Sequence, residues 1–543
     1  MNPLQADVAI IGAGIAGLTC ALELLEHGQR RVLIIDRDQP ERLGGLARES
    51  FGGMFAVDTP EQRRAGIRDS IDLAWADWQS FAEFEPDAVW PRQWAHAYVT
   101  HCTEHMYLWL RGRGARYFPV PNWVERGLYT PGNSVPRFHM VWGTGEKLVL
   151  ALLTQLEPYL ANGALQLRCG LRVDALEQEG GQVVGCRGVA NDSGSAFTVS
   201  AGQVVIAGGG INGGDLSRVR AHWHRDWRVP PELILNGSHR YADGTLHDAA
   251  QALGGRITHL DKQWNYAAGV HHYTSSKPHA GLSLVPPKSA LWLNWRGQRI
   301  GPQPLVSGYD TRDLVRQVCA QERGYSWMLL NQRIALKELA VSGAEHNPSI
   351  RDQHWLAFLR DILLGNRWLL DTMLTRCVDF VQADTLPELA ARMNALQGDD
   401  AVELATLQQA TQSYDAQFDR PPALRNDEQL RRIAHLRQYR GDRVRTCKAQ
   451  RIVDEHALPL IAIRCFIISR KSLGGIQTDL QSRVLGAERR PINGLYAVGE
   501  AAGFGGGGVH GLRALEGTFL GGCVLSARAA AQSILGRGSL LTV

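Results

Sequence analysis

ADVAIIGAGIAGLTCALELLEHGQRRVLIID, residues Ala6–Asp36, decides the fold of this chain. Within it, Val8–Ile11 is a short apolar run that predicts a strand, and Leu18–Leu25 has the apolar spacing of a helix. Val32–Ile35 predicts a second strand, which an acidic residue closes. A strand, a glycine turn, a helix and a strand in this order predict a Rossmann-type unit, and therefore an α/β fold.

The glycines between the first strand and the helix indicate a nucleotide site. Gly12, Gly14 and Gly17 follow G-x-G-x-x-G spacing. The first glycine permits a tight turn, the second lets the backbone approach a pyrophosphate, and the third lets the helix pack closely on the strand. The helix N-terminus then faces the phosphates with N–H groups and the positive end of its dipole. Asp36 stands where a carboxylate can accept hydrogen bonds from a ribose, so we predict a dinucleotide site rather than a structural turn.

A second group of glycines bears on which dinucleotide is bound. The chain continues through Gly44–Gly45 to Ser50–Gly53, the sequence SFGG. Backbone amides without side chains can approach a ring that lies beyond the pyrophosphate. This pattern favours a flavin over a nicotinamide.

Length and composition limit the class of protein. A chain of 543 residues is too long for one compact core, so we expect two domains. The 58 basic and 54 acidic residues give a net charge of +4, which indicates no nucleic-acid partner. We find no apolar run of the about 18 residues that a membrane helix needs, and no room for a signal peptide before the first strand. The nine cysteines are scattered, and we expect reduced thiols in a cytoplasmic protein with no metal site.

Further elements follow along the chain. Pro60–Leu110 is helical in character and reads as an insertion beside the nucleotide domain. Leu165–Arg187 predicts two strands around a glycine turn, and Gln203–Ala207 predicts a strand that returns to the first sheet. Gly208–Gly213 repeats the fingerprint spacing, but no good helix follows, so we do not expect a second nucleotide site there. Thr245–Leu253 predicts a helix.

The composition changes after about residue 265. Ala290–Gly301 (ALWLNWRGQRIG) predicts a hairpin, and helical segments are predicted from Asp310 to about Tyr439. Such a block within a Rossmann chain is what a substrate-covering domain would look like. Strand and glycine patterns then return: Leu495–Val498 predicts a strand, and Thr518–Ala531 predicts a helix. The N-terminus of that helix would stabilise negative charge that develops on a reduced flavin.

These patterns predict three stretches of domain structure. Residues 1–264 form the first part of the nucleotide domain, with the helical insertion at about 60–145. Residues 265–454 form a capping or substrate domain, and residues 455–543 complete the nucleotide domain.

Three blocks together resemble a known superfamily: GAGIAG with Asp36, the GG-x4-SFGG segment, and GGIQTD with PINGLYAVGEAAG near the end. They look like the flavoproteins of the fumarate reductase and ketosteroid dehydrogenase superfamily, and most resemble its ketosteroid-dehydrogenase-like FAD-binding dehydrogenases. The resemblance implies a discontinuous FAD domain with an inserted α+β capping domain. Membrane-bound relatives attach FAD to a histidine in the early loop; Leu46–Gly53 has none, so we expect non-covalent FAD.

The resemblance and the glycine patterns together predict the residues that bind the cofactor. They are Gly12, Gly14, Ala16, Gly17, Asp36, Arg37, Gly44, Gly45, Ser50, Gly52, Gly53, Val173, Gly208, Gly499, Glu500, Gly517 and Thr518.

The resemblance also implies a reaction, hydride transfer between a substrate carbon and flavin N5 with proton transfer at the adjacent carbon. In RIGPQPLVSGYDTRDLV, residues Arg299–Val315, Arg312 is similar to the proton-delivering arginine of fumarate reductases. Tyr309 is similar to the proton-removing tyrosine of ketosteroid dehydrogenases. Two structural alternatives stay open: Arg312 can pair with Asp310 or Asp313, and Tyr309 can simply pack.

The chain also departs from both groups. Where ketosteroid dehydrogenases carry a Y-P-G-A-G-like stretch, it reads LEGTF, so their ketone-binding tyrosine is missing. Where fumarate reductases carry histidines before a late glycine pair, it reads RKSL. His510 and Arg513 resemble the H-G-x-x-R of fumarate reductases with one residue fewer between them. We predict that His510, Arg513 and Glu516 bind substrate; alternatively, Arg513 pairs with Glu516.

Three functions follow from these features. The first is a cytoplasmic FAD enzyme that desaturates, or reduces, a C=C bond in a cyclic ketone such as a ketosteroid. The second is a fumarate-reductase-like enzyme for unsaturated carboxylic acids, and the third is a non-catalytic flavin redox relay. The first implies an apolar cyclic substrate and a separate electron acceptor or donor.

Overall fold

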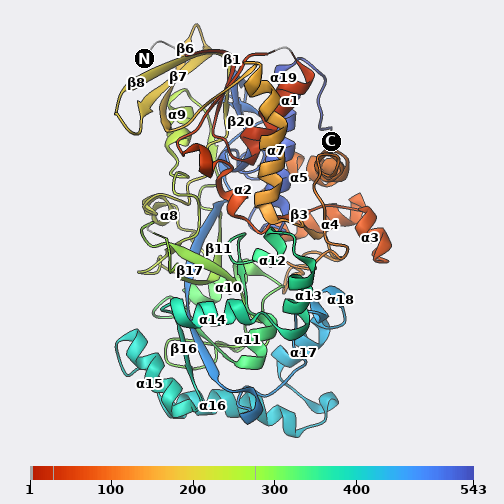
Figure 1. Cartoon of the computed structure of the whole chain (residues 1–543), viewed down its shortest axis with the longest axis vertical. Coiled ribbons are helices and arrows are strands. Elements are labelled where there is room, and N and C mark those ends of the chain that lie inside the picture. The colour runs from red at the N-terminus through yellow and green to blue at the C-terminus, as the bar shows by residue number, and fades with distance from the viewer. Residues whose placement is uncertain (1–3, 29, 276, 543) are drawn as a thin grey trace. The chain divides into compact units, whose positions relative to one another are not determined.

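The computed structural model describes residues 4–28, 30–275 and 277–542, and it divides the chain into two compact units (Figure 1). Unit 1 comprises Met1–His224, Ser238–Trp264 and Lys471–Val543. Unit 2 comprises Arg225–Gly237 and Asn265–Arg470. The chain thus passes from unit 1 into the long part of unit 2 after residue 264 and returns to unit 1 after residue 470. We predicted the return at residue 455.

Unit 1 is built on an eight-stranded sheet in the order β19-β20-β7-β8-β1-β2-β5, with β6 paired to β7. The strands of unit 1 are β1 (Leu4–Ile11), β2 (Val32–Ile35), β3 (Gly53–Phe55), β4 (Phe138–Met140), β5 (Leu165–Arg168), β6 (Leu171–Glu179), β7 (Gln182–Ala190), β8 (Ala196–Ile206), β10 (Ile257–Thr258), β18 (Gly475–Ile476), β19 (Arg483–Leu485) and β20 (Pro491–Ala497). Strand β1 pairs in parallel with both β2 and β8, and β20 pairs in parallel with β8. The two ends of the chain therefore contribute to one sheet, which confirms the discontinuous α/β fold, and β8 returns to it as predicted.

The central strands are apolar throughout because both faces of the sheet are covered. On one face, Ile11, Ile35 and Ile206 join a core cluster that includes residues of α9. Helix α1 packs against both α19 and α7 beside the sheet (Figure 1). The helices of unit 1 are α1 (Ile15–His27), α2 (Gly45–Glu49), α3 (Pro60–Arg64), α4 (Ile71–Ala82), α5 (Val89–Cys102), α6 (Trp109–Gly112), α7 (Thr144–Ala161), α8 (Ser217–Ala221), α9 (Thr245–Ala252) and α19 (Thr518–Ile534), with short helical turns η1 (Pro40–Arg42), η2 (Thr103–Leu108) and η6 (Gly499–Ala501).

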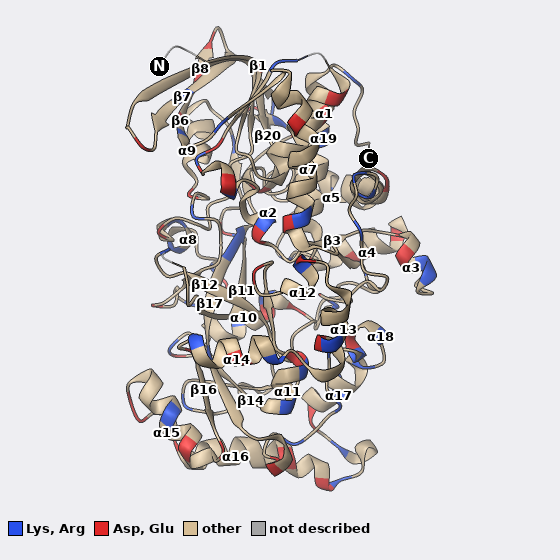
Figure 2. Ribbon diagram, viewed as in Figure 1, with Lys and Arg blue, Asp and Glu red and all other residues tan. Residues whose placement is uncertain are grey.

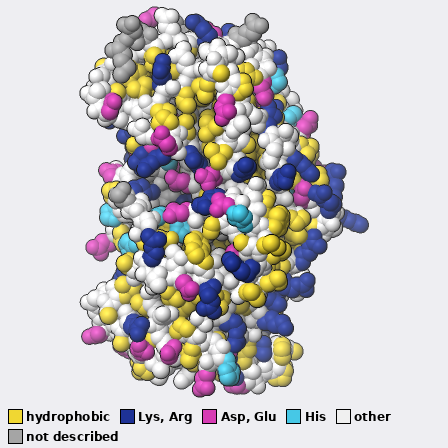
Figure 3. All heavy atoms as spheres, viewed as in Figure 1, with side chains coloured by type: hydrophobic (Ala, Val, Ile, Leu, Met, Phe, Trp, Pro, Cys, Tyr) yellow, Lys and Arg dark blue, Asp and Glu magenta, His cyan; other side chains and the backbone are white. Residues whose placement is uncertain are grey.

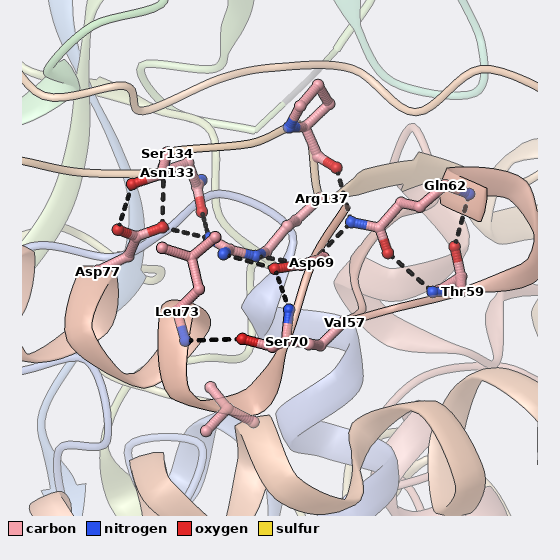
Figure 4. Close-up of polar contacts among 12 residues, drawn as sticks. Val57, Thr59, Gln62, Asp69, Ser70, Leu73, Asp77, Asn133, Ser134 and Arg137 are labelled. Carbon is pink, nitrogen blue, oxygen red and sulfur yellow. Dashed lines mark hydrogen bonds and ion pairs between the residues drawn. The ribbon is translucent and has the colours of Figure 1, made fainter. Parts of the chain in front are cut away.

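The predicted helical insertion is present as α3 to α6, and a buried charge cluster ties it to the following loop (Figure 4). The fully buried Arg137 guanidinium donates to both carboxylate oxygens of Asp69, at 2.9 and 2.7 Å. It also donates to Asp77, at 2.6 Å, and to the side chain of Asn133, at 3.1 Å. The backbone N–H and the hydroxyl of Ser134 donate to Asp77 in turn. Asp69, between α3 and α4, and Asp77, within α4, therefore both bind Arg137 of the following loop.

Unit 2 contains a second, mainly antiparallel sheet in the order β13-β14-β17-β11-β12-β15, with β16 and β9 also paired to β17. Its strands are β9 (Leu235–Asn236), β11 (Gln263–His271), β12 (Gly281–Val285), β13 (Leu291–Leu293), β14 (Tyr325–Asn331), β15 (Ala340–Ser342), β16 (Phe380–Ala383) and β17 (Leu460–Ser472). Its helices are α10 (Thr311–Cys319), α11 (Gln332–Glu338), α12 (Pro348–Arg351), α13 (Trp355–Leu364), α14 (Arg367–Arg376), α15 (Leu386–Gln397), α16 (Leu404–Asp415), α17 (Glu428–Leu436) and α18 (Arg440–Arg443), with short turns η3 (Ala416–Asp419), η4 (Pro422–Leu424) and η5 (Glu455–Ala457).

One prediction for unit 2 needs correction, and another is confirmed. The block Asp310–Tyr439 is not wholly helical, because β14, β15 and β16 interrupt it. Strand β14 is a short apolar run that pairs with β17, and apolar runs of this length do not distinguish a strand from a buried helix. The predicted hairpin at Ala290–Gly301 is present but short: Leu293 bridges Arg299, and the N–H groups of Asn294 and Ile300 donate to the carbonyls of Gln298 and Trp292, at 2.7 and 2.9 Å. Strand β13 also pairs with β14.

Candidate functional site

The glycine loop between β1 and α1 has the geometry that its three glycines predict. Gly12 has a φ of +114°, and a β-carbon there would overlap the carbonyl of Ala207. A β-carbon on Gly17 would overlap the carbonyl oxygen of Gly12, so the helix packs directly on the turn. At Gly14, the residue that begins α1, a β-carbon would have no protein atom within 4 Å. The open space at this helix N-terminus fits the pyrophosphate of a dinucleotide.

Replacing Gly14 with alanine is expected to leave folding intact and to weaken FAD binding by about ten-fold or more. The added methyl group meets no protein atom, but it fills the space in which we predict the pyrophosphate to approach the backbone. Gly112→Ala is the matched control, because its β-carbon also meets nothing within 4 Å and it lies at the end of α6. FAD titration of the apoproteins measures the difference, and equal affinity in the two variants would argue against the loop as the pyrophosphate site.

The acid after β2 is fixed against the same loop. The Asp36 carboxylate accepts from the backbone N–H of Ala13, at 2.5 Å, and of Asp38, at 2.7 Å. The neighbouring Arg37 forms an ion pair with Asp243, at 2.5 Å, and its guanidinium lies 4.5 Å from the ring centroid of Tyr241. Asp36 is thus held at the edge of the glycine loop, as its predicted role requires.

The second glycine segment lies against the first. Gly44 has a φ of +113°, and its N–H donates to the carbonyl of Ala13 at 3.0 Å. Gly44 also forms a bridge with Gly14, and the Cα of Gly14 lies 3.6 Å from the position that a β-carbon on Gly45 would take. Ser50 closes the following turn by donating to the carbonyl of Ala47 at 2.7 Å and accepting from the N–H of Gly52. Gly52 leads into β3, which begins at Gly53.

The C-terminal segment completes this region of unit 1. Gly499 has a φ of +64°, and a β-carbon there would lie 2.9 Å from the β-carbon of Ala16 in α1. The adjacent Glu500 accepts from the backbone N–H of Ser472, at 2.9 Å. Gly517, which begins α19, accepts through its carbonyl from the N–H of Phe55, at 2.8 Å. The early and late glycine segments therefore meet around the N-termini of α1 and α19.

Two predicted cofactor residues lie in the part of unit 1 formed by β6, β7 and β8. Val173 is buried in β6, where it pairs with Gly188 of β7. Gly208 follows β8, and a β-carbon there would overlap the side chain of Leu246.

His510, which we predict to bind substrate, is completely buried in an aromatic surround. Its ring stacks on Trp78 with centroids 6.0 Å apart, and the ring of Phe519 lies at 4.9 Å. Its Nε2 lies 2.7 Å from the hydroxyl oxygen of Thr518, which itself donates to the carbonyl of Leu515. This arrangement favours a neutral ring that carries its proton on Nε2. Burial, with a smaller effect of Lys471, lowers the pKa of His510 to about 3.

We expect acid to destabilise the protein partly through His510. Its pKa is lower in the folded state than the ordinary value of about 6.5, so below pH 6.5 the unfolded state binds the proton first. At pH 4.5 the free energy of unfolding should have fallen by about 3 kcal/mol from this residue alone. Urea unfolding at pH 7 and pH 4.5 should show a smaller fall for His510→Gln than for the exposed control His354→Gln. An equal fall in both would contradict a neutral buried His510.

The other two predicted substrate residues have partners within unit 1. Arg513 forms an ion pair with Glu83 at the end of α4, at 2.5 Å. Glu516 accepts from the indole N–H of Trp264, at 2.9 Å. His510 contacts the predicted cofactor residue Thr518, and Glu516 directly precedes Gly517 and Thr518 in the chain. Their substrate roles stay predictions.

The two predicted proton-transfer residues lie in unit 2, at the start of α10. Tyr309 is buried, its hydroxyl lies 3.0 Å from Nδ1 of His435, and the guanidinium of Arg432 lies 5.6 Å from its ring centroid. Arg312 is also buried; it contacts Asp226 at 3.4 Å, and its guanidinium lies 5.4 Å from the ring centroid of Trp227. Asp310 caps α10 by accepting from the N–H of Asp313. Sequence reasoning missed His435, Arg432 and Asp226, which no local motif marks.

One acidic group in unit 1 has the spacing of a metal site. Glu23, Glu26 and His27 at the end of α1 could together offer ligand atoms. The Glu23 carboxylate, however, already accepts from the side chains of Trp109, Arg528 and Gln532, at 2.9, 2.8 and 3.0 Å. These bonds explain the buried acid without an ion.

Comparison with known proteins identifies the chain. The profile of the FAD binding domain family matches residues 7–520. The chain belongs to this family. Two curated relatives of the chain are named KsdD-like steroid dehydrogenases. The one from Mycolicibacterium smegmatis is 41% identical over 95% of this chain and 96% of its own length. The one from Mycobacterium tuberculosis (strain ATCC 25618 / H37Rv) is 41% identical over 97% of this chain and 95% of its own length.

Solved structures show the same fold. The 3-ketosteroid delta1-dehydrogenase of Sterolibacterium denitrificans has a TM-score of 0.71 at 16% identity, over 98% of this chain and 99% of that one. An open-conformation flavocytochrome c3 fumarate reductase has a TM-score of 0.68 at 19% identity, over 98% of this chain and 79% of that one.

The expectations of FAD as the cofactor and of an enzyme are confirmed. This member of the FAD binding domain family is an FAD-dependent oxidoreductase of the dehydrogenase class. Among the helices that the structure describes, none combines the length and the apolar character needed to cross a membrane.

Proposed function

We propose that this protein desaturates a C–C bond beside the carbonyl of a cyclic, largely apolar ketone, with a ketosteroid as the representative substrate. The observation that carries the proposal is the 41% identity, over nearly the whole chain, to proteins named KsdD-like steroid dehydrogenases. The glycine loop and the two flanking glycine segments support FAD as the redox partner in this reaction.

Desaturation removes a hydride from one carbon and a proton from its neighbour, and FAD supplies the hydride acceptor when bound. The remaining tasks fall to the protein. We propose that the hydroxyl oxygen of Tyr309 receives the proton. The Arg432 guanidinium beside its ring would stabilise the negative charge of a deprotonated hydroxyl. Nδ1 of His435, 3.0 Å away, can exchange that proton with water, because His435 is exposed.

A second candidate is reduction of an unsaturated carboxylic acid, and one contact favours it. Arg312 is buried and lies 3.4 Å from Asp226, which is half exposed, so a proton could pass from water through the acid to the arginine. In this case Arg312, not Tyr309, would deliver the proton to the substrate carbon.

An anaerobic mixing experiment tests the proposal. Oxidised protein is mixed with 4-androstene-3,17-dione, the steroid bound in one structurally similar ketosteroid dehydrogenase. We expect the flavin absorbance band to bleach and mass spectrometry to find a steroid with two hydrogens fewer. If the band persists although FAD is bound, this steroid is not a donor. Dithionite-reduced protein mixed with fumarate then tests the second candidate by reoxidation.

A further inference from the structure

Helix α13 of unit 2 is unusual for its exposed apolar surface. Its sequence is WLAFLRDILL; the structure describes all ten residues, and none of them is buried. Leu356 is 86% exposed, Leu363 76% and Leu364 77%. Large apolar side chains exposed together at this level mark an interaction surface rather than an ordinary solvent face.

Aromatic residues stand at both ends of this surface. Trp355 begins α13, and Trp368 follows in the first turn of α14; both are exposed. We define the apolar patch as Trp355, Leu356, Leu359, Leu363, Leu364 and Trp368. Tryptophan is favoured where one side of a ring meets apolar chains and the other meets water, as at the surface of a bilayer.

Basic side chains lie beside the apolar patch. The segment RQYRGDRVRTCK, Arg437–Lys448, contains five basic residues and one acid, and includes α18. Asp361 of α13 lies close enough to Arg445 of this segment to influence its pKa electrostatically, so the two elements are neighbours. Arg440, Arg443 and Lys448 are exposed. Figure 2 shows basic residues on α13 and α18, and Figure 3 shows hydrophobic side chains in the region of α13 with Lys and Arg side chains near them.

We propose that the apolar patch and the basic segment dock unit 2 on the surface of an anionic phospholipid bilayer. The leucines and tryptophans would enter the boundary between headgroups and acyl chains, and the exposed arginines and lysine would contact lipid phosphates. A second copy of this chain is a poorer occupant. A two-fold interface would place the patch against itself and bring the same basic segments into repulsive contact.

The biological reason for such docking rests on the proposed function, because an apolar cyclic ketone partitions into bilayers. Its test does not depend on that function, since vesicle binding is measured without substrate.

The experiment is flotation of the FAD-loaded protein with vesicles of phosphatidylcholine alone and of phosphatidylcholine with phosphatidylglycerol. We expect binding to the anionic vesicles that weakens with salt. Leu356→Ser with Leu363→Ser should reduce binding by at least about 100-fold. Arg440→Gln with Arg443→Gln should reduce it by about 25-fold. Leu424→Ser with Arg420→Gln, both exposed outside the patch and the basic segment, is the matched control and should not change it.

Other results overturn the proposal. If the wild-type protein does not float with anionic vesicles, a bilayer partner is excluded. If all variants bind equally well, the apolar patch does not contact the bilayer. Light scattering after size-exclusion chromatography tests whether a second copy of this chain binds the apolar patch. If the wild-type protein dimerises and Leu356→Ser with Leu363→Ser makes it monomeric, the patch is a self-association surface. FAD content and thermal melting of each variant show that it remains folded.

Discussion

Replacing Tyr309 with phenylalanine should lower kcat for desaturation by about 10²- to 10⁴-fold while FAD stays bound. The substitution removes only the hydroxyl that lies 3.0 Å from His435, and the ring keeps its place beside Arg432. Without that oxygen, the proton that leaves the substrate has no acceptor at this position. Stopped-flow measurement of the bleaching rate reports the chemical step directly.

Two companion variants make the result specific. Tyr325→Phe removes the hydroxyl of a second tyrosine in unit 2, which is half-buried and donates to Gln397 at 2.9 Å. This variant should leave kcat unchanged. Arg312→Met tests the second candidate. If Arg312→Met abolishes fumarate-dependent reoxidation while Tyr309→Phe has full activity, the protein is a reductase and Tyr309 is a packing residue.

The dinucleotide loop could be predicted from the sequence because its causes are local. Gly12 allows the turn, Gly17 allows the helix to pack closely, and Gly14 leaves open space at the helix N-terminus. All three lie in one short segment, so the sequence spacing is enough to indicate them. The helix after Gly517 was also predicted, and the structure forms it as α19 with nearly all of Thr518–Ala531 buried.

Long-range pairing explains what the sequence did not show. Strand β14 is a strand because β17, far along the chain, pairs with it, and nothing within the run itself favours a strand over a helix. In the same way, Tyr309 meets His435 and Arg432 of α17, and Arg513 meets Glu83 of the insertion. The motifs located these candidates, but only the folded chain supplies the charges around them.

Arg137→Met should be the most destabilising of the single substitutions that we consider, by about 3–5 kcal/mol in the free energy of unfolding. The side chains of Arg137 and Asp69 are fully buried, and that of Asp77 is nearly so. Removing the guanidinium leaves two carboxylates facing each other without water or counter-charge. Urea unfolding, followed by tryptophan fluorescence, measures the loss.

An exposed pair provides the control for this prediction. Arg63 and Asp58 lie in the same part of unit 1 and also form a two-bonded pair, but both are exposed. Arg63→Met should therefore cost at most about 1 kcal/mol. A loss of that size for Arg137→Met would show that water reaches the buried cluster and supports the two carboxylates.

A variant that removes the two carboxylate charges together with the arginine distinguishes the cost of burying unpaired charges from the loss of the hydrogen bonds. Arg137→Met combined with Asp69→Asn and Asp77→Asn should recover part of the lost stability, because buried amides cost less than unpaired carboxylates. The cluster also leads directly into β4, which pairs with β3 and so with the segment Ser50–Gly53. Arg137→Met should then weaken FAD binding as well, and the triple variant should restore both properties together if the cluster acts by holding that strand pair in place.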